Sequence, residues 1–197
     1  MTTLPTPTAV LVVDDEAGIR KTLARFLTRM GYRAVEAEHG ARALELQAVE
    51  RPAAILCDVL MPELTGVELV PKALAHDPDV AIIMLTAVDR PATAIECLRL
   101  GARDYLIKPV DLDELRIALE TALRLRQLEI ERRDLERWLA GEVASRTREV
   151  EERLGAVREV ALDLLAASPA DDAAVERLAR ALGTTAEAVR SAIPRRS

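Results

Sequence analysis

The sequence predicts an α/β fold, a five-stranded doubly wound parallel sheet, followed by a long coiled-coil helix and a small helical tail. Over residues 9–108, five short apolar runs alternate with helical patterns, which is typical of βα units. From Leu112 to Leu165 there is no proline and only two glycines, and charges are interleaved among leucines, so this stretch predicts one helix. Residues 166–197 follow as a short tail. We therefore expect three regions, with bounds 1–110, 111–165 and 166–197.

The apolar runs define the five strands, which we expect at residues 9–13, 32–37, 53–57, 80–85 and 104–107. Three of these runs are apolar on consecutive residues, as expected for strands that are covered by helices on both faces. The helices between them are predicted at residues 16–30, 40–50, 64–76 and 91–100. Gly31 and Gly101 stand where helix C-caps should be. In a sheet of this kind the ligand site lies beyond the carboxyl ends of the strands.

Composition excludes several classes of function. With 27 basic and 33 acidic residues the formal charge is -6, which argues against a broad basic surface for nucleic acid or anionic lipid. Four aromatic residues are too few for the stacking platforms that bind single-stranded nucleic acid. Cys57 and Cys97 have no partner at metal-ligand spacing and form no dense disulfide framework, so we expect a reducing compartment. The sequence has neither a signal peptide pattern nor a membrane-length apolar segment, which predicts a cytoplasmic protein.

Acidic side chains follow two of the predicted strands. Asp14 and Asp15 come directly after the first strand and Asp58 after the third, so all three should share one pocket. Three carboxylates that close repel one another unless a cation lies among them, and hard oxygen ligands favour Mg²⁺. Lys108 ends the fifth strand on the same rim. A carboxylate between a divalent metal and a lysine can attack phosphorus, which would leave an acyl phosphate on Asp58.

A simpler interpretation is that these aspartates are helix N-caps, as Asp14 or Asp15 could be for the helix that begins near Glu16. Against it, Thr86 and Lys108 also stand at strand ends, so that four strands bring polar groups to one edge of the sheet. Cys57, beside Asp58 in an apolar strand, is interpreted as a small core residue.

Four segments resemble the receiver domain of two-component response regulators, a flavodoxin-like fold that chemotaxis regulators share. They are VLVVDDE at 10–16, DVLMPELTG at 58–66, MLTA at 84–87 and GARDYLIKP at 101–109. The resemblance covers the first 110 or so of the 197 residues. It implies that Asp58 accepts a phosphoryl group from a histidine kinase. It also implies that the protein is no enzyme beyond its own phosphorylation and dephosphorylation.

The resemblance further implies a role for each residue of the site. Asp15 would bind Mg²⁺ directly, Asp14 largely through water and Leu60 through its backbone carbonyl. Thr86 would bond a phosphoryl oxygen and Lys108 would pair with the phosphoryl group, with a cis peptide bond before Pro109. On phosphorylation Thr86 would move inward, and Tyr105 would rotate into the space it leaves.

The segment 111–165 predicts a coiled coil. Apolar or small residues repeat at spacings of three and four at Leu139, Val143, Thr147, Val150, Leu154, Val157, Ala161 and Leu164. Extended back, this seam meets Arg132 and Glu136, so a stutter or a break near Gly141 is expected. A helix of this length spans about 80 Å and needs a partner, most simply its own copy. We therefore predict a homodimer through residues 112–165.

The tail leaves three interpretations open: contact with DNA, a helical cap or protein-docking element, and an undocked mobile tail. Residues 171–193 predict two short helices broken at Gly183-Thr184-Thr185, the pattern of a helix-turn-helix, in which Thr185, Arg190 and Ser191 would face DNA. Any two amphipathic helices joined by such a turn give much of this pattern, and the tail then docks on a protein. We expect a response regulator whose coiled coil and tail act on a partner protein. The alternative is a dimeric DNA-binding transcriptional regulator.

Overall fold

The computed structural model describes residues 7–87, 91–166 and 172–192. Its contacts divide the chain into two compact units, Met1–Arg133 and Asp134–Ser197. The first unit extends beyond residue 110 because it includes the first turns of the long helix. A boundary at residue 110 therefore stays a prediction. Within the described residues, no helix combines the length and the apolar character that crossing a membrane requires.

The first unit contains one sheet of five parallel strands. Their bounds are β1 Ala9–Val13, β2 Arg33–Ala37, β3 Ala54–Asp58, β4 Ala81–Ala87 and β5 Asp104–Lys108. The order in the sheet is β2-β1-β3-β4-β5. All four neighbouring pairs are parallel, so the predicted five-stranded parallel sheet is confirmed.

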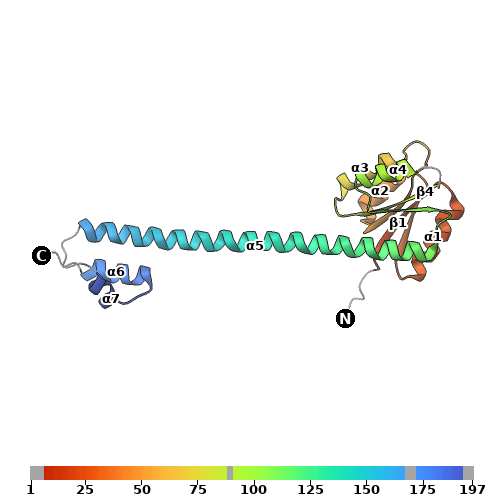
Figure 1. Cartoon of the computed structure of the whole chain (residues 1–197). Helices are drawn as coiled ribbons and strands as arrows, with labels where there is room; N and C mark the ends of the chain where they lie inside the picture. The colour runs from red at the N-terminus through yellow and green to blue at the C-terminus, as the bar shows by residue number, and fades with distance from the viewer. Residues whose placement is uncertain (1–6, 88–90, 167–171, 193–197) are drawn as a thin grey trace. The chain divides into compact units, whose positions relative to one another are not determined.

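Helices cover both faces of this sheet (Figure 1). Their bounds are α1 Ala17–Arg29, α2 Gly40–Glu50, α3 Gly66–His76, α4 Pro91–Arg99 and α5 Leu112–Ala166. One core lies under α2, α3 and α4 and contains Leu69 and Cys97. The other lies under α1 and the first turns of α5 and contains Leu27, Leu115 and Leu119. The doubly wound architecture is thereby confirmed, and the sheet is buried from both sides.

Three strands continue past the ends of their predicted apolar runs, β5 by one residue to Lys108 and β3 and β4 past their polar ends. The sequence predicts that β3 ends at Cys57 and β4 at Leu85, because polar residues follow both. In the structure Asp58 still pairs with Leu85 and Thr86 with Ile107 in the parallel ladder. Both polar residues are therefore held by strand hydrogen bonding and not by a loop, which fixes their direction at the edge of the sheet.

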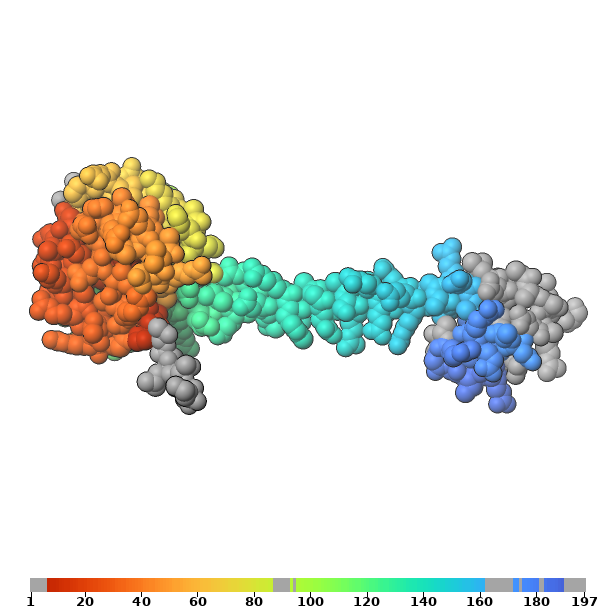
Figure 2. Space-filling model, turned by 180° about the vertical axis from the view of Figure 1, so that it is seen from behind, coloured from red at the N-terminus to blue at the C-terminus, as the bar shows by residue number. Residues whose placement is uncertain are grey.

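The long helix α5 runs without interruption from Leu112 to Ala166. The break expected near Gly141 does not occur, because one glycine inside a helix costs only about 0.5–1 kcal/mol relative to alanine. Leu115 and Leu119 are fully buried on the sheet. Leu139 and Leu154, further along, are 47% and 62% exposed, and Figure 2 shows side chains of this later stretch uncovered. The apolar stripe of the later stretch therefore has no partner among the described residues.

The tail forms the two short helices that its sequence predicts, α6 Asp172–Leu182 and α7 Ala186–Ala192. They enclose a small core of their own, made by Val175, Ala179 and Val189 with Leu178 and Ala186 packed against it. Gly183 to Thr185 separate the two helices, as predicted.

Candidate functional site

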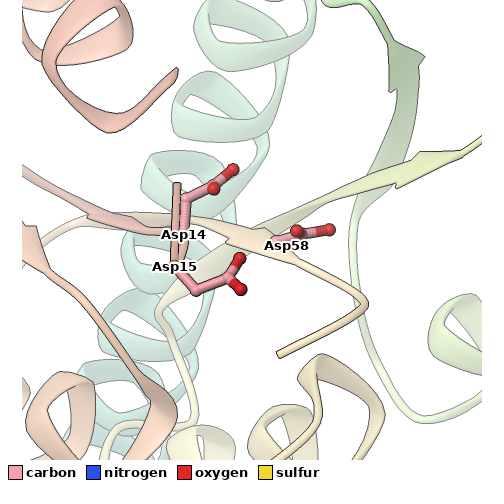
Figure 3. Close-up of side chains that lie close together, drawn as sticks. All are labelled: Asp14, Asp15 and Asp58. Atoms are coloured by element: carbon pink, nitrogen blue, oxygen red, sulfur yellow. The ribbon is translucent and has the colours of Figure 1, made fainter. Parts of the chain in front are cut away.

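Three carboxylates meet at the carboxyl edge of the sheet (Figure 3). Asp14 and Asp15 directly follow β1, and Asp58 is the last residue of the neighbouring strand β3. One oxygen from each lies within 4.8 Å of the others. Asp14 and Asp58 are buried and Asp15 is exposed, so the cluster has a buried base and one open side. The convergence that the sequence predicted for these three residues is present.

Lys108, at the end of β5, reaches two of these carboxylates. Its Nζ donates to Asp14 Oδ2 at 2.8 Å and to Asp58 Oδ2 at 2.7 Å. The side chain of Lys108 is only 17% exposed. One ammonium thus bridges two buried carboxylates in surroundings where charges interact more strongly than in water. The peptide bond between Lys108 and Pro109 is cis, as the resemblance implies.

The second oxygens of Asp14 and Asp58 are held by backbone donors. Leu60 N–H donates to Asp58 Oδ1 at 3.3 Å, and Glu16 N–H donates to Asp14 Oδ1 at 2.9 Å. The N-cap of α1 is Glu16, whose side chain makes no capping bond. Helix capping therefore does not explain Asp14 or Asp15, and the simpler interpretation of these residues is not supported.

The charges of this site are incompletely balanced. Burial raises the pKa of Asp58, and the hydrogen bond and charge of Lys108 only partly oppose this effect. Burial lowers the pKa of Lys108, but its hydrogen bonds to Asp14 and Asp58 outweigh burial and leave that pKa raised. Three carboxylates face one ammonium, so the pocket favours a further cation. Hard oxygen donors around a small space fit Mg²⁺.

Thr86 and Tyr105 lie in two neighbouring strands, β4 and β5. Thr86 is buried near the end of β4, next to β3 on one side and β5 on the other. Tyr105 lies in β5, two residues before Ile107, which is the register partner of Thr86. The Tyr105 side chain is 38% exposed. Their roles as a switch pair stay a prediction.

Two residues that support the site were missed in the sequence. A Cβ at Gly66 would overlap the carbonyl oxygen of Asp58, so only glycine lets α3 begin against β3. Arg20 donates from Nη1 to the backbone oxygen of Asp14 at 2.7 Å and lies 3.4 Å from Glu36 through its Nε. A glycine one residue after Thr65, the N-cap of α3, was the available signal for Gly66. Arg20 offered none, because its partner is a backbone atom.

An apolar hollow of about 310 Å³ adjoins Lys108. Its lining is Gly18, Ile19, Thr22, Leu23, Lys108, Pro109, Val110 and Leu112. These residues come from α1 and from the connection between β5 and α5. The hollow therefore opens beside the charged site and not within it.

The surroundings of Cys57 do not support a role for its thiol in this chemistry. It is fully buried, and burial together with the charge of Asp58 raises its pKa well above the usual value of a thiol. Because the thiolate is the reactive form, such a cysteine is inert. The interpretation of Cys57 as a core residue agrees with this position.

The tail residues predicted to face DNA are only partly described. The hydroxyl of Thr185 accepts a hydrogen bond from Ala188 N–H at 3.3 Å, so Thr185 caps α7. Arg190 and Ser191 lie in α7, but their side chains are outside the described residues. The structure therefore assigns Thr185 a structural part and leaves its contact with DNA a prediction.

Known proteins are similar to a large part of this chain. The regulatory protein AtoC of Escherichia coli is 37% identical over 131 residues, which make up 66% of this chain and 28% of that protein. The probable transcriptional regulator ycf27 of Guillardia theta is 44% identical over 121 residues, 61% of this chain and 47% of that protein. The chain thus spans about half or less of the length of these relatives.

Solved structures agree. The chemotaxis protein CheY4 of Vibrio cholerae superposes with a TM-score of 0.56 at 31% identity, over 59% of this chain and 99% of that one. NtrX of Brucella abortus, solved in complex with ADP, gives a TM-score of 0.64 at 29% identity, over 66% of this chain and 30% of that one. Residues 10–120, more than half of the chain, match the family described as the response regulator receiver domain. The chain belongs to this family and carries the receiver domain of a two-component response regulator.

Proposed function

We propose that Asp58 accepts a phosphoryl group from a sensor histidine kinase and thereby switches the state of α5 and the tail. The observation that carries this proposal is the bridge from Lys108 Nζ to Asp58 Oδ2 at 2.7 Å, inside a cluster of three carboxylates. A carboxylate in this position is oriented, and a positive charge already stands where a phosphoryl oxygen would arrive.

Receiver domains bind Mg²⁺ at an acidic pocket, and the donors of this chain fit that ion. Asp14, Asp15 and Asp58 would hold it through carboxylate oxygens, and Leu60 through its backbone carbonyl. When bound, the ion neutralises charge on the transferring group. The exposed carboxylate of Asp15 is the most accessible of the three donors.

The transfer itself needs little more than positioning. A carboxylate oxygen of Asp58 attacks phosphorus while the bond to the donor nitrogen of the kinase histidine breaks, and no external acid or base is required at Asp58. Lys108 then pairs with a phosphoryl oxygen, and the Thr86 hydroxyl bonds another. Tyr105 follows Thr86 inward, which changes the surface formed by α4 and β5.

The hollow beside Lys108 suits the phosphodonor protein. Its wall is apolar where Ile19, Pro109 and Val110 meet, and it includes Lys108, which bonds Asp58. Replacement of Ile19 by Asp should slow transfer from the kinase while labelling by acetyl phosphate, a small donor that needs no docking, stays unchanged. The proposal places this exchange in the cytoplasm, where thiols such as Cys57 stay reduced.

Labelling by acetyl phosphate tests the acceptor. The wild-type chain should take up one phosphoryl group when Mg²⁺ is present and none when the metal is chelated. Asp58→Ala should abolish the uptake, while Asp77→Ala, at the C-cap of α3 and outside the cluster, should keep it. Full labelling of Asp58→Ala would contradict the assignment.

We propose that the chain acts as a homodimer through residues 112–165. The support is the exposed apolar stripe of α5, since Leu135, Val143 and Val150 are each at least 55% exposed on an otherwise charged helix. Sedimentation at micromolar concentration should give a dimer for the wild type and a monomer for Val143→Asp with Val150→Asp. A monomeric wild type, phosphorylated or not, would contradict the dimer.

The output we propose is a partner protein that binds the coiled coil and tail. The alternative, DNA binding by a helix-turn-helix, is favoured by the hairpin of α6 and α7 and by relatives whose names are those of transcriptional regulators. Selection of fragments from genomic DNA by the full chain and by a truncation at Leu165, with and without beryllofluoride and Mg²⁺, separates the two. A palindrome enriched by the full chain alone supports DNA output, and no enrichment in either state supports a partner protein.

A further inference from the structure

Two ion pairs hold α5 against the amino edge of the sheet, opposite the carboxylate cluster. Arg103 meets Glu129 with both ends of its guanidinium, through Nη1 to Oε1 at 2.9 Å and through Nη2 to Oε2. Arg133 donates from Nη2 to Asp79 Oδ2 at 2.5 Å. Asp79 precedes β4 and Arg103 directly precedes β5. We call this set of four residues the clasp.

The clasp extends the contact between α5 and the sheet, which begins with apolar side chains. Its helix residues share one face with the buried leucines, at spacings of four, three, seven and four in the order Leu115, Leu119, Ala122, Glu129 and Arg133. Leu115, Leu119 and Ala122 are buried on the sheet. Beyond Ala122 the helix contacts the rest of the unit through the charged pairs of Glu129 and Arg133, which extend the contact by about three turns. Glu129 and Arg133 lie beyond residues 10–120, the part that matches the family.

Three further apolar side chains form a stripe on a face of α5 that differs from the face of the clasp. Ile117, Leu125 and Leu128 are 59%, 46% and 52% exposed within the same unit. At 100° per residue this stripe is roughly 100° around the helix from the clasp face. One segment of α5 can therefore contact its own receiver and a second helix at the same time.

Arg103 connects the clasp to the elements that carry the switch residues. It lies two residues before Tyr105, and its backbone N–H donates to Ile82 of β4 at 2.7 Å. Tyr105 belongs to β5, and Thr86 belongs to β4, the strand that also contains Ile82. A shift of these two strands would move the Arg103 backbone, and the bidentate bond would pass the movement to Glu129, because a fork with two bonds fixes orientation as well as distance.

We propose that the clasp, and Arg103 with Glu129 above all, transmits the state of the receiver to the coiled coil. The inference rests on the proposed phosphorylation of Asp58 and adds the route by which it reaches α5. Arg103 and Glu129 are positioning residues and contact no reacting group. The pair is 28% and 44% exposed, so its effect lies in register and direction more than in stability.

Hydrogen exchange of the full chain tests this route. Exchange of residues 124–133 is compared with and without beryllofluoride and Mg²⁺ in the wild type, in Arg103→Gln, and in the charge reversal Arg103→Glu with Glu129→Arg. The matched control is Glu142→Gln, which removes a pair with Arg146 that lies within α5 alone. The ability of Asp58 to accept a phosphoryl group is measured for each variant by acetyl phosphate labelling in the absence of beryllofluoride.

We expect Arg103→Gln to load normally, to exchange about fivefold faster over residues 124–133, and to lose the change that loading causes there. The charge reversal should restore that change, and Glu142→Gln should keep it. A fully loaded Arg103→Gln whose helix responds like the wild type would overturn the proposal. Failure of the wild type to load would instead overturn the proposed phosphorylation. The clasp is then judged on unloaded protein, where equal exchange in Arg103→Gln and wild type would overturn it.

Discussion

The carboxyl edge of the sheet and the exposed stretch of α5 contain similar charged side chains in opposite environments. Lys108 bridges Asp14 and Asp58, whose side chains are 0% and 8% exposed. Arg146 pairs with Glu142 on the helix surface, where the two side chains are 76% and 46% exposed. The positions of Asp14, Asp58 and Lys108 are fixed by three different strands. Arg146 and Glu142 are held together only by one turn of the same helix. Burial therefore strengthens the ion pairs at the edge of the sheet, whereas water screens the pair on the helix surface.

Leucines of α5 should show the largest contrast between the two regions. Leu119 is fully buried on the sheet, so Leu119→Ala should lower the free energy of unfolding of the receiver by about 2–5 kcal/mol in urea titrations. Leu154 is 62% exposed, and Leu154→Ala should leave that unfolding unchanged and weaken self-association in sedimentation. Equal losses in the two variants would mean that both faces of α5 pack within one chain.

Removal of a positively charged side chain should also affect stability differently in the two environments. Lys108→Met leaves the buried carboxylates of Asp14 and Asp58 without the ammonium that they share and should lower the free energy of unfolding by about 1–3 kcal/mol. Arg146→Met should cost about 0.5 kcal/mol or less. Both variants keep Asp14, Asp15 and Asp58, so added Mg²⁺ should raise the melting temperature of both, and more in Lys108→Met, where no ammonium competes for the carboxylates. No Mg²⁺ effect in either variant would contradict the carboxylate cluster as the binding site.

Replacement of two glycines by alanine should change stability in opposite directions. Gly66→Ala places a methyl group against the Asp58 carbonyl and should destabilise the receiver by about 1–3 kcal/mol while slowing labelling of Asp58. At Gly141 a Cβ meets nothing within 4 Å, so Gly141→Ala should stabilise α5 by about 0.5–1 kcal/mol. Circular dichroism melts and labelling rates measure both. A neutral Gly66→Ala with normal labelling would show that α3 does not need its close approach to β3.

The smallest expected effect is a pH dependence at the start of α3. The hydroxyl and the backbone N–H of Thr65 donate to Glu68 and lower its pKa below the usual 4.5. A lowered pKa in the folded state contributes stability that is present above the unfolded value and is lost as pH falls through the folded value. The melting temperature of wild type should therefore exceed that of Glu68→Gln near neutral pH, and the difference should vanish in acid. A difference that does not change with pH would argue against the capping box.

Much of the receiver was predictable because its pattern is local. Apolar runs of consecutive residues predicted the five strands, and polar residues directly after them predicted the edge where Asp14, Asp58 and Lys108 converge. The ends of β3 and β4 were predicted one or two residues short, since Asp58 and Thr86 resemble loop residues but keep their ladder pairing.

What the sequence did not predict depends on contacts between distant residues. Arg103 and Glu129 are 26 residues apart, and Asp79 and Arg133 are 54 apart, so no spacing rule connects them. Charged residues on a long helix also look alike whether they face water or a receiver. Of the stutter or break expected near Gly141, the break does not occur, because the cost of one glycine is small beside the many hydrogen bonds of α5, and the stutter stays a prediction.

The location of the phosphoryl group tests the central claim most directly. After labelling with acetyl phosphate and Mg²⁺, the wild-type chain is digested and the modified peptide is identified by mass spectrometry. The account predicts a single modification, on Asp58, which is absent when Mg²⁺ is chelated. Modification of Asp14, Asp15 or a residue outside the cluster, with Asp58 unmodified, would contradict it.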